Sequence, residues 1–123
     1  MNTEKKSILV VDDEAIVRIS CKRILEPEGF NVEVANDGYE ALELIKKKGY
    51  EIIITDLKMP KMDGLEVLKW IKENSPQSKV IVITGFSTPE IAEKSLSAGA
   101  EKYLEKPFTP DVLINAVRSV LVE

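Results

Sequence analysis

Acidic, hydroxyl and basic side chains stand directly after successive apolar segments of this chain. In chain order, these residues are Asp12, Asp13, Asp56, Thr84 and Lys106. In a parallel α/β sheet the carboxyl ends of the strands share one edge, so residues far apart in sequence would converge there. Three carboxylates, a hydroxyl and an ammonium at one edge could bind a divalent cation and accept a phosphoryl group. The spacing therefore predicts a magnesium-dependent phosphoryl-acceptor site.

A cation would be needed for these acids to share a site. Carboxylates about 5 Å apart repel each other by roughly 3 kcal/mol per pair at an effective dielectric constant of about 20. Oxygen ligands and a phosphate to share favour Mg²⁺. Each residue alone has a simpler structural explanation: Asp13 could cap a helix that begins near Glu14, and Lys106 could be a solvated charge. Four strand ends that carry this combination of groups favour the shared site.

The composition limits the other possibilities. With 123 residues, of which 44% are hydrophobic and 31% charged, the chain is expected to form one globular domain. A net charge of -4 argues against direct binding to nucleic acid, which needs a basic face. The chain contains no histidine, and its single cysteine, Cys21, excludes an intramolecular disulfide. The few apolar residues after the charged stretch Met1–Lys6 do not predict a signal peptide or membrane span, so a cytoplasmic location is expected.

Strand-like and helix-like segments alternate along the chain. Five apolar segments with little polar alternation predict strands buried on both faces, and helical spacing of apolar residues between and after them predicts five helices. This alternation predicts a doubly wound α/β fold, a (βα)5 flavodoxin-like three-layer sandwich whose five-stranded parallel sheet has the order 2-1-3-4-5. That order would bring Asp12 and Asp13 against Asp56. The predicted strands are Ile8–Val11, Val32–Ala35, Ile52–Ile54, Val80–Ile83 and Tyr103–Leu104.

Five short motifs follow one another in a fixed order. They are Val10–Glu14, Thr55–Pro60, Met62–Gly64, Ile83–Gly85 and Glu105–Phe108. In this order and spacing they resemble the receiver (phosphoacceptor) domain of bacterial two-component response regulators, of the chemotaxis-regulator-like kind. The resemblance extends from about Lys5 to the end of the chain. It implies a single receiver domain over residues 1–123 that is not an enzyme in the ordinary sense, although it assists its own phosphorylation and dephosphorylation.

The resemblance also assigns roles at the acidic site. Asp56 would accept the phosphoryl group from a phosphohistidine of a sensor histidine kinase or phosphotransfer protein. Asp13 and Asp56 would bind Mg²⁺ directly, Asp12 through water, and Lys58 through its backbone carbonyl. Lys106 would pair with Asp56 at rest and with a phosphoryl oxygen afterwards.

Further residues would pass the signal on. Thr84 would donate its hydroxyl to the phosphoryl group, and the small Gly85 would leave room for it. Tyr103 would be an aromatic switch that turns inward when Thr84 moves. The Lys106–Pro107 peptide bond would be cis. We also hypothesise that the side chains of Lys58 and Phe86 hinder attack by water and slow self-dephosphorylation.

The output surface in this family is the face formed by the fourth helix, fifth strand and fifth helix. Here that face would comprise about Pro89–Ala98, Glu101–Leu104 and Pro110–Val122, and would contact an output domain or downstream protein, or form a homodimer. Arg118 is the only arginine near the end of the chain, so the arginine-rich dimer pattern of many DNA-binding regulators is not evident. Nucleic acid and membrane are not expected as direct partners.

Three other functions remain open on the sequence alone. A haloacid-dehalogenase-like phosphatase also uses a strand-end aspartate and Mg²⁺, but it needs a second aspartate two residues later, where this chain has Lys58. A flavodoxin-like binding module would offer hydroxyls and amides to a phosphate in its first loop, where Asp12, Asp13 and Glu14 would repel it. A receiver fold that serves only as an interaction scaffold would not need the acids, Thr84 and Lys106 together.

Overall fold

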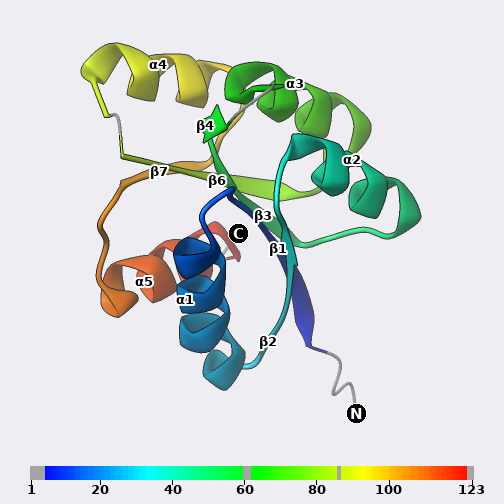
Figure 1. The fold of residues 1–123 in the computed structure, drawn as a ribbon, viewed down its shortest axis with the longest axis vertical. Coiled ribbons are helices and arrows are strands. Elements are labelled where there is room, and N and C mark those ends of the chain that lie inside the picture. Colours follow the sequence, from blue (N-terminus) through cyan, green and yellow to red (C-terminus); the bar gives the residue numbers. More distant parts are fainter. Residues whose placement is uncertain (1–4, 60–61, 86, 122–123) are drawn as a thin grey trace.

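Five parallel strands form the central sheet of the computed structural model, which describes residues 5–59, 62–85 and 87–121. Their order is β2-β1-β3-β6-β7, which confirms the predicted order 2-1-3-4-5 of the five successive parallel strands (Figure 1). The strands are β1 (Lys6–Val11), β2 (Phe30–Ala35), β3 (Ile52–Asp56), β6 (Lys79–Thr84) and β7 (Lys102–Glu105).

Helices cover both faces of this sheet, as predicted. Helices α1 and α5 lie on one face, and α2, α3 and α4 lie on the other (Figure 1). Their bounds are α1 (Ala15–Leu25), α2 (Gly38–Lys47), α3 (Gly64–Asn74), α4 (Pro89–Ser97) and α5 (Pro110–Leu121), and a short 3₁₀ helix, η1 (Glu26–Glu28), follows α1. The three-layer sandwich is therefore confirmed.

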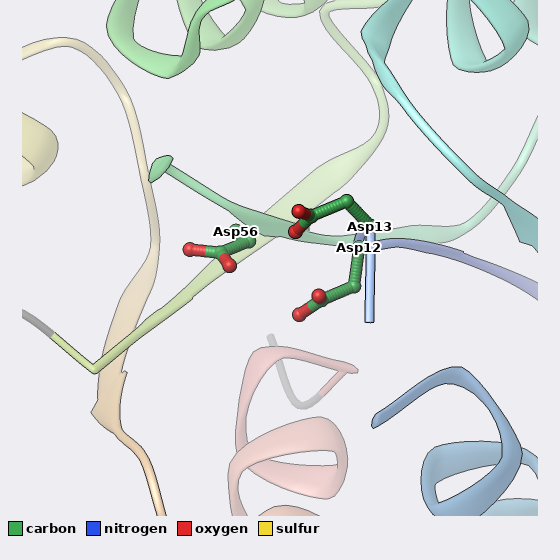
Figure 2. Close-up of side chains that lie close together, drawn as sticks. All are labelled: Asp12, Asp13 and Asp56. Carbon is green, nitrogen blue, oxygen red and sulfur yellow. The ribbon is translucent and has the colours of Figure 1, made fainter. Parts of the chain in front are cut away.

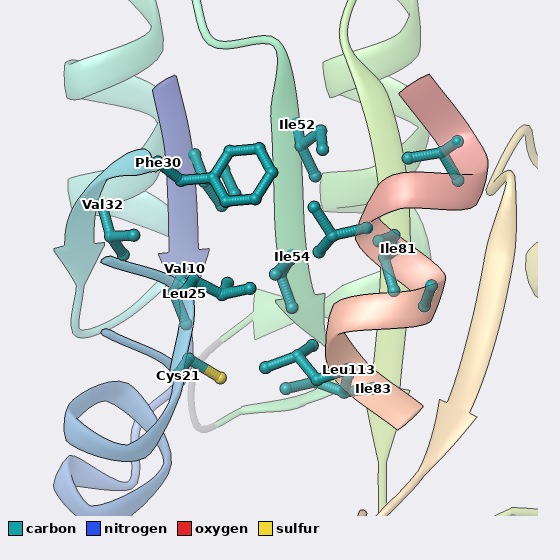
Figure 3. Packing of buried hydrophobic residues seen from close by; sticks show 14 residues of the cluster. Val10, Cys21, Leu25, Phe30, Val32, Ile52, Ile54, Ile81, Ile83 and Leu113 are labelled. Carbon is teal, nitrogen blue, oxygen red and sulfur yellow. The ribbon is translucent and has the colours of Figure 1, made fainter. Parts of the chain in front are cut away.

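The strands β1, β3 and β6 are buried on both sides, which explains their lack of polar alternation. The edge strands β2 and β7 are exposed in part, so the prediction of burial on both faces is wrong for them. Successive side chains of a strand point to opposite faces. Val10 and Ile54 accordingly pack with Leu25 of α1 and Leu113 of α5 on one face (Figure 3), whereas Leu9 packs on the α2 and α3 side. Full burial of each such aliphatic side chain contributes about 1.5–3 kcal/mol relative to exposure. Two cores therefore hold the strand ends at fixed positions.

A small two-stranded antiparallel sheet lies outside the predicted pattern. It pairs β4 (Lys58–Met59) with β5 (Met62–Asp63), between the end of β3 and the start of α3. The periodicity of the sequence gives no signal for strands of two residues. Asp63, the last residue of β5, caps α3 by accepting a hydrogen bond from the Leu65 amide at 3.0 Å.

Gly64, the first residue of α3, is required by close backbone contact. A Cβ placed on Gly64 would collide with backbone atoms of Leu57, which cannot move without shifting the loop after Asp56. At Gly49 a Cβ would meet no atom within 4 Å. The loop that follows the site is therefore packed against the start of α3.

We predict that Gly64→Ala lowers the free energy of unfolding by about 1–3 kcal/mol, the usual cost of overpacking. Gly49→Ala is the matched control and should leave stability within about 0.5 kcal/mol of the parent. Urea denaturation followed by the fluorescence of Trp70, the single tryptophan, measures both. Equal stability of the two variants would contradict the steric explanation.

Candidate functional site

The ends of β1 and β3 bring the three predicted aspartates together. Val11 of β1 is paired in register with Thr55 of β3, so Asp12, directly after β1, lies beside Asp56, the last residue of β3. Carboxylate oxygens of Asp12, Asp13 and Asp56 all lie within 4.8 Å of one another (Figure 2). Asp12 and Asp56 are buried and Asp13 is exposed. The structure thus has the convergence that the strand-end argument requires.

Asp12 is fixed by its surroundings. Its amide donates to the Ala35 carbonyl of β2 at 3.2 Å, and its own carbonyl accepts from Arg18 Nη1 at 2.8 Å. Its Oδ1 accepts a hydrogen bond from the Glu14 amide at 2.9 Å. Asp12, rather than Asp13, is therefore the aspartate that binds a backbone amide at the start of α1, and the alternative capping role considered for Asp13 is not supported.

Asp56 is held by one group on each carboxylate oxygen. The Lys58 amide donates to Oδ1 at 3.0 Å, and Lys106 Nζ donates to Oδ2 at 2.9 Å. Lys106 is itself positioned by its backbone, because its amide donates to the Thr84 carbonyl at 2.9 Å. The Lys106–Pro107 peptide bond is cis, as the resemblance implies. The carboxylate of Asp56 therefore has a defined orientation.

The ammonium of Lys106 is shared by three carboxylates. Its Nζ lies 2.9 Å from Asp12 Oδ2, 2.9 Å from Glu14 Oε1 and 2.9 Å from Asp56 Oδ2. Burial by itself lowers the pKa of Lys106, but the attraction of the three carboxylates outweighs it, so the pKa is raised above its ordinary value. The lysine therefore carries its positive charge in this site.

Asp12 retains an oxygen that could bind a cation. Burial raises the pKa of Asp12, and the nearby Lys106 ammonium offsets that effect only in part. Although Asp12 Oδ2 faces the ammonium, it accepts no hydrogen bond of good geometry within the described part of the chain. A buried carboxylate oxygen in this condition is costly unless a cation neutralises it. The donor set consists of carboxylate oxygens, which Mg²⁺ and Ca²⁺ prefer.

An open hollow of about 420 Å³ lies over this cluster. A hydrated divalent cation and a small anion would fit a space of this size, and both signs of charge line it. The lining residues are Asp13, Glu14, Asp56, Lys58, Gly85 and Lys106. A Cβ on Gly85 would meet nothing within 4 Å, so the small residue leaves this side of the hollow open. The residues present therefore fit the predicted magnesium site.

The two predicted switch residues lie on neighbouring strands, Thr84 on β6 and Tyr103 on β7. Thr84 ends β6, is buried, and lines a neighbouring hollow between the β4–β5 hairpin and α4. Tyr103 of β7 is half-buried, and its hydroxyl is buried without a hydrogen-bond partner among the described residues. Both residues were predicted from the resemblance. Neither the hollow beside Thr84 nor the burial of the Tyr103 hydroxyl could be predicted from the sequence.

Two predicted roles, those of Phe86 and of the Lys58 carbonyl, stay predictions. Phe86, half of the hypothesis on phosphoryl lifetime, lies outside the described residues. The Lys58 amide binds Asp56, whereas the metal-binding role of its carbonyl stays a prediction.

The sequence reasoning missed the contacts of Glu14 with Lys106 and of Arg18 with the Asp12 carbonyl. The only available signal for Glu14 was a third acid directly after the aspartate pair.

Comparison with known proteins gives consistent results. Residues 8–118 match the family model described as the response regulator receiver domain. The chain is 38% identical over 114 residues to the response regulator MprA of Mycobacterium leprae. The aligned segment covers 93% of this chain and 50% of that protein. The chain thus spans about half the length of the curated relatives that it matches.

Solved structures agree with the sequence match. A CheY-like response regulator receiver domain protein from Methanospirillum hungatei superposes with a TM-score of 0.92 at 36% identity, covering 96% of this chain and 94% of that one. A response regulator from Burkholderia pseudomallei, solved with a phosphorylated aspartic acid, a calcium ion and citrate, has a TM-score of 0.84 at 26% identity and covers 96% and 74% of the two chains.

None of the helices in the described segments is long and apolar enough to cross a membrane. The fold has the predicted strand order, its acidic residues meet at one edge of the sheet, and a family model matches most of its length. This chain belongs to the response regulator receiver domain family of two-component signalling.

Proposed function

We propose that Asp56 accepts a phosphoryl group from the phosphohistidine of a sensor histidine kinase or phosphotransfer protein. The observation that carries this proposal is the buried Asp56 carboxylate at the base of an open hollow, fixed by an amide on one oxygen and by the Lys106 ammonium on the other. The phosphorylated aspartic acid in the Burkholderia pseudomallei relative supports it by analogy. The reaction would form a bond between an Asp56 oxygen and phosphorus while the phosphorus–nitrogen bond breaks and its electron pair returns to the imidazole.

Asp12, Asp13 and Asp56 would hold Mg²⁺ in this reaction, with the Lys58 carbonyl as a further ligand. The ion, when bound, supplies charge neutralisation for the phosphoryl oxygens. The chain itself supplies positioning. The Lys58 amide orients the attacking carboxylate, and the Lys106 ammonium offers hydrogen bonds to the negative charge of the incoming group. Phosphoryl transfer depends chiefly on such positioning and electrostatic stabilisation, which this site is built to provide.

Thr84 and Tyr103 would transmit the conformational effect of phosphorylation from the site to the rest of the domain. The added phosphoryl group presents new acceptor oxygens, to which the Thr84 hydroxyl can move from the adjacent hollow. A shift of a conformer from 1% to about half of the population needs roughly 2.7 kcal/mol, which two charge-assisted hydrogen bonds can supply. Movement of Thr84 would change the space available to Tyr103 on the neighbouring strand.

The outputs of the switch are likewise proposals. The face formed by α4, β7 and α5 would contact an output domain, a downstream protein or a second copy of the chain. β7 is an edge strand of the sheet, so this face combines an edge with two helices (Figure 1). The alternative of a haloacid-dehalogenase-like phosphatase is disfavoured because Lys58 stands where that chemistry needs an acid.

We predict that incubation with acetyl phosphate and Mg²⁺ adds the mass of one phosphoryl group to the intact protein. Asp56→Asn should abolish this gain because it removes the nucleophilic carboxylate. Asp111→Asn, an exposed acid on α5, is the matched control and should be phosphorylated like the parent. A full mass gain in Asp56→Asn would show that another group is the acceptor.

Mg²⁺ should stabilise the native state because the site exists only in the folded chain. At a tenfold excess over its dissociation constant, the ion should raise the free energy of unfolding by about 1.4 kcal/mol. Asp13→Asn removes an exposed ligand and should lose most of this increment. Thermal unfolding with and without MgCl₂, against NaCl of equal ionic strength, measures the effect. An equal increment in Asp13→Asn would place the ion elsewhere.

Tyr103→Phe should not destabilise the unphosphorylated domain, because the hydroxyl it removes is buried without a partner among the described residues. Removal of such a group leaves the free energy of unfolding unchanged or raises it by up to about 1 kcal/mol. Urea denaturation provides the measurement. A loss of more than about 1 kcal/mol would mean that the hydroxyl has a structural hydrogen bond.

A further inference from the structure

Glu14 contacts the site without belonging to its metal-binding cluster. Asp12, Asp13 and Asp56 are the acids close enough to one another to share a cation within the described chain. The Glu14 side chain is 55% exposed, yet its Oε1 lies 2.9 Å from Nζ of Lys106, 92 residues further along the chain. As the N-cap residue of α1, Glu14 makes no side-chain hydrogen bond to the helix. Its carboxylate is thus directed to the lysine.

The Lys106 ammonium is enclosed by carboxylates in this arrangement. It donates hydrogen bonds to Glu14 and Asp56, and it faces Asp12 Oδ2 without a hydrogen bond of good geometry. An ammonium has three N–H groups, and three carboxylates surround this one at equal distances of 2.9 Å. A phosphoryl oxygen that approaches Lys106 would therefore compete with these carboxylates for the ammonium. Asp56 is the residue that would be modified and Asp12 would face the ion, so Glu14 is the contact that remains in competition.

We propose that Glu14 is a positioning residue that holds the Lys106 ammonium at the solvent side of the site and competes with the phosphoryl group for it. This inference rests on the proposed function of Asp56. Glu14 would draw the ammonium away from Asp12 and Asp56, and thereby favour Mg²⁺ binding. It would also engage one donor of Lys106 and place a negative charge beside the incoming phosphoryl anion, and thereby slow phosphorylation.

These two effects have opposite signs, which separates positioning from a structural role. A variant that merely loosened the loop after β1 would weaken Mg²⁺ binding and slow phosphorylation together. Loss of the Glu14 carboxylate alone should weaken Mg²⁺ binding but accelerate phosphorylation. Because the side chain is partly exposed, each effect should be modest, roughly two- to fivefold.

The first experiment compares Glu14→Gln with Glu105→Gln. Glu105 is exposed and directly precedes Lys106, but its carboxylate is not one of the three around Nζ. Intact-mass time courses with acetyl phosphate at saturating Mg²⁺ give the rate of phosphorylation. We expect Glu14→Gln to react roughly two- to fivefold faster than the parent, and Glu105→Gln to show less than half of that effect. Equal rates in the two variants, or a slower Glu14→Gln, would overturn the proposal.

The second experiment asks whether Glu14 acts through Lys106. Calorimetric titration with MgCl₂ gives the dissociation constant of the parent, Glu14→Gln, Lys106→Met and the double variant. We expect Glu14→Gln to weaken Mg²⁺ binding roughly two- to fivefold when Lys106 is present. In the Lys106→Met background, Glu14→Gln should weaken Mg²⁺ binding no more than Glu105→Gln does in the parent. Glu105→Gln, titrated in the same way, measures the effect of losing one negative charge without a contact to Lys106.

The same loss of affinity in both backgrounds would overturn the proposal. The titration involves no phosphoryl transfer, so coupling between Glu14 and Lys106 would support the inference even if Asp56 accepted no phosphoryl group. Conversely, normal phosphorylation of Asp56 without any such coupling would leave the proposed function intact and remove Glu14 from it.

Discussion

The interaction on which this site depends is the contact of one ammonium with three carboxylates. Carboxylate oxygens within 4.8 Å of one another repel by roughly 3 kcal/mol or more per pair at an effective dielectric constant of about 20. The Lys106 ammonium offsets part of that repulsion, and its raised pKa keeps it charged. It does so incompletely, since Asp12 Oδ2 still lacks a hydrogen bond of good geometry. The remaining negative charge would attract the divalent cation that the proposed function requires.

The sheet makes this arrangement possible. Parallel pairing of β1 with β3 sets the aspartates of two distant segments side by side. Pairing of β6 with β7 places Glu105 opposite Thr84, so that the amide of the next residue, Lys106, donates to the Thr84 carbonyl. The cores on the two faces of the sheet fix these strand ends, from which the loops carrying the site residues begin. The loop after Asp56 is also held by contact with Gly64 and by the β4–β5 hairpin.

Much of this could be predicted from the sequence, and the omissions have physical reasons. Apolar segments without alternation indicate strands buried on both faces, and the strand-end positions of Asp12, Asp56 and Lys106 imply a common site. The contacts that individual side chains make could not be predicted in this way. Whether Asp12 or Asp13 binds the first helix, and whether Glu14 contacts Lys106, depend on loop dihedrals and rotamers that periodicity does not encode. The hairpin of two-residue strands was missed for the same reason, since it is too short to show a period.

A crystal structure of the protein with Mg²⁺ would show whether the three aspartates hold the ion. We expect an ion bound about 2.0–2.1 Å from carboxylate oxygens of Asp13 and Asp56, with the Lys106 ammonium still in contact with Glu14. An ion bound away from these aspartates, or an acidic cluster that stays free of metal at saturating Mg²⁺, would contradict this expectation.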